Sequence, residues 1–266
     1  MCDNSHKPQV TVPLSIFIIT RNEADRLGET LAAVRGLTDD IVVVDSGSTD
    51  GTQELARRLG ARVVHHDWQG FGPQKRFAEE QCRYDWLLNL DADEVPQPEV
   101  VGGISALFAD GEPPLSLYRI RIVTIYPRHH HPRLFADFVS PVRLYDRRVA
   151  RYSPSLTDDR VVDHGLPSGL VPGAVWHFSF RSFAHIRAKL DGYSDLQTIE
   201  KAGRRSPLVL RLRLLTEYPM QFAKYFIFRR HWTGGVLGAR YAHEIAAAKQ
   251  RRIRRFLEAR QKLSST

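Results

Sequence analysis

The sequence contains little cysteine and no long apolar run. Only Cys2 and Cys82 occur among 266 residues, so a disulfide framework is not expected and a reducing compartment is the default. No uninterrupted apolar run reaches about 18 residues, which argues against a membrane-spanning helix. The opening text, MCDNSHKPQV, lacks the apolar core of a signal peptide. From these absences we expect a cytoplasmic protein.

Two common nucleotide-binding patterns are also missing. The chain has neither the GxGxxG pattern of dinucleotide-binding folds nor the GxxxxGK[ST] pattern of P-loop proteins, and it has no internal repeat. Hydrophobic residues make up 42% of the chain and aromatic residues 10%, which is enough for one sizeable core plus a smaller appendage. A globular protein that binds its ligand by other means is indicated.

Charge divides the chain into two regions. Residues 181–266 carry 19 Lys and Arg against 6 Asp and Glu, a net charge of +13, and since the whole chain is at +8 the rest is at −5. We expect a first domain over 13–180 and a basic helical region over 181–266. The basic region suits anionic lipid or a phosphorylated glycan, although a solvated helix surface gives the same pattern.

Strand-like and helix-like segments alternate in the first hundred residues. Apolar β-branched runs at 14–20, 41–45, 62–66 and 86–90 are separated by helical periodicity at 29–37, 52–61 and 73–83. This alternation predicts an α/β fold with a parallel, doubly wound sheet, whose ligands bind at the carboxyl ends of its strands. Further on, 117–126, 141–152 and 169–180 resemble strands, and helices are expected after 181, interrupted at Pro207, Pro219 and Gly234-Gly235.

An acidic segment follows the fourth expected strand. In LNLDADE, Asp91 and Asp93 stand two residues apart after an apolar run. Such a pair can hold a hard divalent cation, Mg²⁺ or Mn²⁺, together with phosphate oxygens of a substrate. The pattern is common in solvated loops, but at the end of an interior strand the carboxylates would repel one another without a cation. We therefore predict a metal–diphosphate site here.

Other candidate residues have a structural interpretation beside the functional one. Asp45 and the Thr20-Arg21-Asn22-Glu23 stretch either contact a nucleotide or form a strand-to-helix turn and a helix cap. Lys75 and Arg143 either face phosphate or lie on an outer surface. His177 either approaches the cation or packs in the core. The run His129-His130-His131 predicts an exposed basic loop, since adjacent histidines cannot all face one ion.

A transferase also needs a base. The pair Asp158 and Asp159, in the polar stretch YSPSLTDDRVVDHG, is the best candidate, because neighbouring carboxylates raise one another's pKa. An exposed turn is the competing interpretation.

Several blocks in order resemble family 2 glycosyltransferases, in the branch similar to lipopolysaccharide core β-1,4-glucosyltransferases. They are LSIFIITRNEADRLGETLAAV, DDIVVVDSGSTDGTQELARRLGARVV, DWQGFGPQKRFAEEQCRYDWLLNLDADE and VRLYDRRVARY, which cover much of 14–152. The resemblance implies a GT-A fold (a Rossmann-like mixed sheet) and an inverting transfer of one sugar from a UDP-sugar, with glucose favoured. It assigns nucleotide contacts to Thr20, Asn22, Glu23 and Asp45, and metal–diphosphate binding to Asp91 and Asp93.

The same resemblance places the catalytic base at Asp159. Similar proteins have a Leu-Val-His-Glu segment where this chain reads Leu156-Thr157-Asp158-Asp159, so Asp-Asp replaces His-Glu. Relatives act on lipid-anchored acceptors at the inner membrane. The resemblance therefore implies a lipid-anchored glycan acceptor, such as the lipopolysaccharide inner core, and a peripheral position on the inner face of that membrane. The stretch 207–232, where leucines and aromatics alternate with Arg and Lys, suits a membrane interface, although a packed helical subdomain explains it equally well.

Alternatives remain open at this point. Another surface polysaccharide or lipid-linked glycan is an alternative acceptor. A sugar nucleotidyltransferase would be expected to carry glycines after the first strand, and TRNEADR has none. A non-catalytic nucleic-acid-binding protein would use the basic region but would leave the acidic segment unexplained. We do not expect a nucleic-acid partner.

Overall fold

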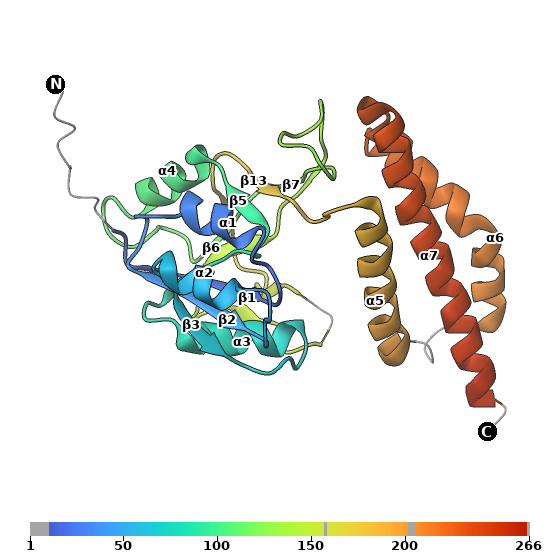
Figure 1. Cartoon of the computed structure of the whole chain (residues 1–266), viewed down its shortest axis with the longest axis horizontal. Helices are drawn as coiled ribbons and strands as arrows, with labels where there is room; N and C mark the ends of the chain where they lie inside the picture. The colour runs from blue at the N-terminus through green and yellow to red at the C-terminus, as the bar shows by residue number, and fades with distance from the viewer. Residues whose placement is uncertain (1–10, 157–158, 202–205, 265–266) are drawn as a thin grey trace. The chain divides into compact units, whose positions relative to one another are not determined.

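The computed structural model describes residues 11–156, 159–201 and 206–264. They form two compact units, one comprising residues up to Val123 together with Phe138–His177, the other comprising Thr124–Asp137 and the residues from Phe178 onward. The first is an α/β unit and the second is helical (Figure 1). The sequence-based division placed 124–137 with the α/β part, whereas compactness groups this loop with the helices.

The first unit is built around a seven-stranded mixed sheet. Its order is β12-β6-β9-β4-β1-β2-β3, and a second sheet has the order β5-β13-β7-β8. The strands are β1 Leu14–Thr20, β2 Asp40–Asp45, β3 Arg62–His65, β4 Trp86–Asn89, β5 Glu94–Pro96, β6 Leu117–Arg119, β7 Ile122–Thr124, β8 Phe138–Val139, β9 Val142–Asp146, β10 Arg151–Tyr152, β11 Val161–Val162, β12 Gly169–Leu170 and β13 Val175–His177.

Strands β1 to β4 are parallel neighbours, as the alternating pattern predicted. Strand β9 lies antiparallel between β4 and β6, which makes the sheet mixed. The α/β class with a mixed sheet and a helical C-terminal region is thereby confirmed.

Helices cover both faces of this sheet (Figure 1). They are α1 Leu27–Ala33, α2 Thr52–Arg58, α3 Phe71–Gln81 and α4 Pro98–Leu107. Alternate residues of β1 point to opposite faces: Ile16 and Ile18 pack with α1, α2 and α4, whereas Phe17 packs with Ala78 of α3. Burial on both faces explains why β1 and β2 are continuously apolar.

The expected single strand over 117–126 is wrong. The chain forms β6 and β7, which belong to different sheets, and the pairing of β6 with β9 shifts register between Tyr118 and Arg119. Such a bulge bends the strand and redirects it. The carbonyls of Arg119 and Arg121 then accept hydrogen bonds from Val171 and Val175, which lead into β13.

The second unit contains α5 Phe183–Lys201, α6 Pro207–Ala223, a π-helical turn η2 Lys224–Phe228, a 3₁₀ turn η3 His231–Gly234 and α7 Gly235–Ser264. The breaks expected at Pro207 and at Gly234-Gly235 coincide with element boundaries. The break expected at Pro219 is wrong, because α6 continues through it. Pro219 and Leu215 are both exposed, so water can hydrate the carbonyl that proline leaves unpaired. Within the described residues, no helix has the length and apolar character needed to cross a bilayer.

A buried carboxylate ties the strands together at the edge where β1 and β2 begin. Asp40 accepts hydrogen bonds from Ser15 Oγ at 2.5 Å, the Arg83 N–H at 2.7 Å and the Arg62 guanidinium at 3.2 Å. Burial alone raises the pKa of the Asp40 carboxyl, but these hydrogen bonds and the charge of Arg62 hold it below its ordinary value.

We predict that Asp40→Asn lowers the free energy of unfolding by about 1–3 kcal/mol at pH 7, because the amide removes a charged acceptor from buried donors. A carboxyl with a lowered folded-state pKa stabilises above its unfolded pKa, and this contribution is lost as pH falls through the folded value. The difference in the free energy of unfolding between wild type and variant should therefore narrow below about pH 4. Urea unfolding of wild type and variant at pH 7 and below about pH 4 measures this difference.

Asp39→Asn is the matched control, since Asp39 is half exposed beside Asp40 and its loss should change stability by less than about 0.5 kcal/mol. Equal stability of wild type and Asp40→Asn at pH 7 would contradict the role assigned to this carboxylate.

Candidate functional site

The site is centred on a fully buried lysine. Lys75, in the second turn of α3, has no exposed side-chain surface. Its ammonium group donates to Asn89 Oδ1 at 3.0 Å and to Asp91 Oδ1 at 3.1 Å, and it pairs with Asp159 Oδ1 at 2.7 Å. Burial lowers the pKa of Lys75, but the charges of Asp159 and Asp91 outweigh it and raise the pKa above its ordinary value. A permanently charged ammonium therefore lies at the end of β4.

Arg143 supplies a second buried cation from the neighbouring strand β9. It donates to Asp91 Oδ2 at 3.1 Å and to Glu94 Oε1 at 2.7 Å, and it also contacts Asn89. The pKa of Asp91 would be raised by burial, but Lys75 and Arg143 hold it well below its usual range. Burial raises the pKa of Glu94 despite the nearby Arg143. The two cations thus keep Asp91 ionised in a partly buried position.

The acidic segment folds into a tight turn that gathers its carboxylates. The Asp91 N–H donates to Glu94 Oε2 at 3.0 Å, and the Glu94 N–H donates to the Asp91 carbonyl at 3.0 Å. Asp93 turns elsewhere: its carboxylate pairs with Arg26 at 3.0 Å and with His177 Nε2 at 3.2 Å. Burial lowers the pKa of His177, but Asp93 raises it, with the net shift upward.

Two side chains of this turn and one of strand β13 are placed to share one metal ion. Asp91, Glu94 and His177 each offer a ligand atom, and these atoms lie within 4.8 Å of one another. The sequence predicted Asp91, Asp93 and His177 as ligands; the geometry groups Glu94 with Asp91 and His177, while Asp93 pairs with the His177 ring. At metal sites, a carboxylate that is hydrogen-bonded to a metal-binding histidine commonly fixes the orientation of the imidazole ring. Two carboxylates and an imidazole fit Mn²⁺, while Mg²⁺ prefers oxygen alone.

The nucleotide candidates lie in two loops that hydrogen-bond to each other. The Asn22 N–H donates to Ser48 Oγ at 2.8 Å, Thr49 N–H donates to Asn22 Oδ1 at 2.9 Å, and Glu23 N–H donates to Thr52 Oγ1 at 2.9 Å. Asn22 has φ of +57°, a conformation that asparagine tolerates better than most residues. Glu23 also pairs with Arg26, which links these loops to Asp93.

Asp45 organises its own turn. Its carboxylate accepts from Thr20 Oγ1 at 3.0 Å, from the backbone N–H of Gly47 and Ser48, and from Gln53 at 2.7 Å. Burial raises the pKa of Asp45, but the hydrogen bonds from Ser48, Thr20 and Gln53 lower it overall. Both its carboxylate oxygens thus hold together the loop after β1 and the loop after β2.

Close backbone approach positions Asp159. The N–H groups of Phe71 and Gly72 donate to the carbonyls of Leu156 and Ser155 at 3.1 Å each. A Cβ at Gly72 would lie 2.1 Å from the Ser153 carbonyl oxygen, so only glycine permits this contact. The DWQGFG block therefore docks the chain that leads to Asp159 against α3. Asp158 lies outside the described residues.

Sequence reasoning missed four contributors to the site. Two are Glu94 and Arg26, whose contacts are given above. The other two are Asn89 and Tyr152: Asn89 Oδ1 accepts a hydrogen bond from Tyr152 Oη at 2.6 Å as well as one from Lys75. A third acid in DADE was the only sequence signal for Glu94. Arg147, four residues after Arg143, binds Asp85 and the carbonyls of Glu79 and Cys82.

Known proteins resemble this chain over most of its length. The model of glycosyl transferase family 2 matches residues 15–162. An uncharacterized glycosyltransferase of Rickettsia conorii is 36% identical over 240 residues, which is 86% of this chain and 84% of the relative. The lipopolysaccharide core biosynthesis glycosyltransferase LpsC of Rhizobium meliloti is 43% identical over 88 residues, covering 31% of this chain and 32% of LpsC.

Two solved structures are also similar. TarS of S. aureus, residues 1–349, matches with a TM-score of 0.49 and 13% identity over 94% of this chain and 91% of TarS. Glucosyl-3-phosphoglycerate synthase of Mycobacterium tuberculosis, in complex with Mn²⁺, UDP and glucosyl-3-phosphoglycerate, matches with a TM-score of 0.44 and 19% identity over 65% and 74%. The family model matches more than half of the residues, and the Rickettsia conorii relative is similar along most of the chain. The chain therefore belongs to glycosyl transferase family 2 and has the GT-A fold of that family.

Proposed function

We propose that this glycosyltransferase is metal-dependent and transfers one sugar from a UDP-sugar, with glucose favoured, to a lipid-anchored glycan. The observation that carries the proposal is the arrangement around Asp91, where two buried cations and a potential three-residue metal group meet. A diphosphate leaving group needs positive charge on its oxygens as the sugar departs. Lys75 and Arg143 hold such charge in place before the reaction begins.

The donor would be held in three parts. The nucleoside would lie against the loops after β1 and β2, with Thr20, Asn22, Glu23 and Asp45 shaping its pocket through their mutual hydrogen bonds. The diphosphate would lie near Asp91, Lys75 and Arg143. Asp91, Glu94 and His177, with Asp93 orienting His177, would hold Mn²⁺ or Mg²⁺, which supplies charge to neutralise the diphosphate.

Asp159 is our candidate for the base that accepts the proton of the attacking hydroxyl. Its side chain is one-third exposed and remains within 2.7 Å of Lys75, so it stands at the border between the buried cations and solvent. An inverting transfer needs its base on the face opposite the leaving group. Lys75 contacts both Asp159 and Asp91 and thereby fixes the spacing between base and diphosphate.

The acceptor and the location of the protein are proposed from two further observations. The partial similarity to LpsC favours a lipopolysaccharide core acceptor. In α6, Leu208, Leu212 and Leu215 are largely exposed and recur at helical spacing beside Arg211. Such a surface fits the interface of an anionic membrane. We therefore propose a peripheral position on the cytoplasmic face of the bacterial inner membrane.

Our first prediction from this proposal concerns donor binding. In Asp91→Asn, UDP affinity in the presence of Mn²⁺ should fall about 10- to 100-fold, because the variant loses a metal ligand and the anion that fixes both cations. Isothermal titration with UDP, with and without Mn²⁺, measures the change. Asp110→Asn, the same substitution at an exposed residue of the same unit, should bind UDP like the wild type. Metal-independent binding in the wild type would contradict metal dependence.

The second prediction concerns Asp159. In Asp159→Asn, kcat for glucose transfer from UDP-glucose to inner-core lipopolysaccharide should fall about 100- to 10,000-fold, the range expected for loss of a general base. UDP affinity should change little, because Asn89 and Asp91 still hold Lys75. Asp159→Glu, which keeps a carboxylate, should retain more activity than Asp159→Asn. If Asp159→Asn turns over at the wild-type rate, another group is the base.

A further inference from the structure

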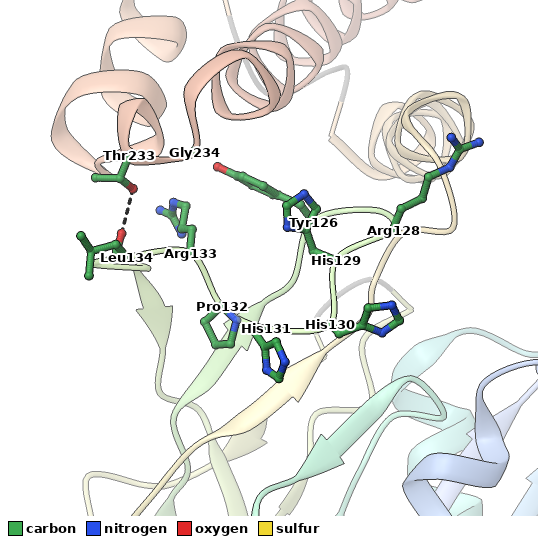
Figure 2. A pocket seen from close by; sticks show the side chains of 10 residues that line it. All are labelled: Tyr126, Arg128, His129, His130, His131, Pro132, Arg133, Leu134, Thr233 and Gly234. Atoms are coloured by element: carbon green, nitrogen blue, oxygen red, sulfur yellow. Dashed lines mark hydrogen bonds between the residues drawn. The ribbon is translucent and has the colours of Figure 1, made fainter.

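The helical unit contains a pocket of about 510 Å³ made from residues that play no part in the donor site. Its walls come from the loop after β7 and from the 3₁₀ turn η3, which precedes α7. Figure 2 shows Arg133 and Tyr126 near the turn that carries Thr233 and Gly234, with His129, His130 and His131 following one another along the loop. A hydrogen bond from Thr233 Oγ1 to the Leu134 carbonyl, 2.8 Å long, joins the two walls.

The lining is basic and contains no carboxylate. Arg128 and Arg133 lie among the three histidines, and the whole stretch 126–136 lacks Asp and Glu, as does 225–240 on the opposite wall. The acid that follows this stretch in the sequence is Asp137. Its single carboxylate is shared by Arg133, Arg229 and His231, at 2.5, 3.4 and 3.5 Å. Positive charge therefore exceeds negative charge around the pocket, which favours an anionic ligand.

Arg133 is held in place as a binding group would be. Only 6% of its side chain is exposed, and its guanidinium lies 5.7 Å from the centre of the Tyr126 ring. One terminal nitrogen donates to Asp137 and to the Arg229 carbonyl, at 2.5 and 2.7 Å. Its Nε has no hydrogen-bond partner within the described residues. That atom is shielded by the surrounding protein, so Arg133 acts on the pocket through its positive charge and its fixed position.

The aromatic side chains beside Arg133 are closely packed. Tyr126 Oη and His231 Nδ1 are 2.6 Å apart, and the ring of His231 stacks on Tyr241 at 4.7 Å. A Cβ at Gly234 would lie 2.5 Å from the Tyr126 ring, and one at Gly238 would lie 1.8 Å from the His231 carbonyl oxygen. Gly234 thus allows η3 to rest directly on the Tyr126 ring, and Gly238 allows α7 to approach the backbone of η3. The pocket is therefore a built feature of this unit.

The segments that form the pocket also carry exposed apolar side chains. Leu134, Phe135, Trp232 and Val236 are 69%, 61%, 54% and 85% exposed. Leu134 and Phe135 are on the loop, Trp232 is in η3, and Val236 is the second residue of α7. A free inorganic anion would make no use of these side chains, whereas an amphiphile would place its anionic head among the basic groups and its chains on them.

We propose that this pocket binds the phosphate group of an anionic lipid, with Arg128, Arg133 and the histidines around its oxygens and with Leu134, Phe135, Trp232 and Val236 against its acyl chains. Arginine suits this ligand because its planar donors match phosphate oxygens. The site goes beyond the proposed transfer reaction, and binding to it requires neither donor nor metal.

The test is titration calorimetry of the full chain, without nucleotide or metal, using three soluble probes: dihexanoyl phosphatidic acid, dihexanoyl phosphatidylcholine and inorganic phosphate. We expect the phosphatidic acid to bind more tightly than either other probe. Arg128→Asn should weaken this binding roughly tenfold, as the loss of one charge-assisted contact implies. Asparagine suits position 128, where φ is +66°.

Arg254→Gln is the matched control, because it removes one exposed positive charge from α7 of the same unit and should leave the affinity unchanged. Trp232→Ser should weaken phosphatidic acid binding but not inorganic phosphate binding. Equal affinity for phosphatidic acid and inorganic phosphate would overturn the lipid assignment in favour of a free anion. No binding of either, or equal weakening by Arg254→Gln, would overturn the site itself. Since no transfer is measured, these results are independent of the proposed function.

Discussion

Burial of the Lys75 ammonium group constrains the whole arrangement of the α/β unit. A fully buried cation is strongly unfavourable unless anions and hydrogen-bond acceptors surround it. Its partners come from different parts of the chain: Asn89 and Asp91 at the end of β4, and Asp159 after the loop that docks on α3. Helix α3, strand β4 and the 153–156 segment must therefore meet at one point, and Gly72 permits the closest of these contacts.

The antiparallel strand β9 completes this point by adding a second cation. Arg143 lies beside Asp91 and Glu94 because β9 pairs with β4. From Asp91 the charged network continues through the metal group to His177, then to Asp93 and Arg26, and so reaches the loop after β1. One continuous set of contacts thus connects the proposed base, the proposed diphosphate site and the proposed nucleoside pocket. A buried network of this kind is poorly explained by stability alone, since apolar residues of similar size often stabilise as well or better.

Strand and helix periodicity was sufficient to predict the parallel strands β1 to β4, and the polar residues at their carboxyl ends indicated where the site would lie. The sequence could not show which carboxylate of DADE turns toward which partner, because the tight turn at 91–94 decides this. It also could not show that Arg26 reaches Asp93, 67 positions away. The bulge at Tyr118 and the helix through Pro219 likewise depend on pairing and solvation that local periodicity does not contain. Grouping of 124–137 with the helices follows from aromatic packing around Tyr126, which sequence proximity conceals.

The roles proposed for the site depend most on a divalent cation held by Asp91, Glu94 and His177 against the donor diphosphate. Electron–nuclear double resonance on Mn²⁺ in the presence of UDP tests it most directly, since it detects nuclei bonded near the ion. We expect a phosphorus coupling from UDP and a nitrogen coupling from His177. The nitrogen coupling should disappear in His177→Gln while the phosphorus coupling remains. A Mn²⁺ signal that stays that of the free ion when UDP is added would contradict the account, as would a nitrogen coupling that persists in His177→Gln.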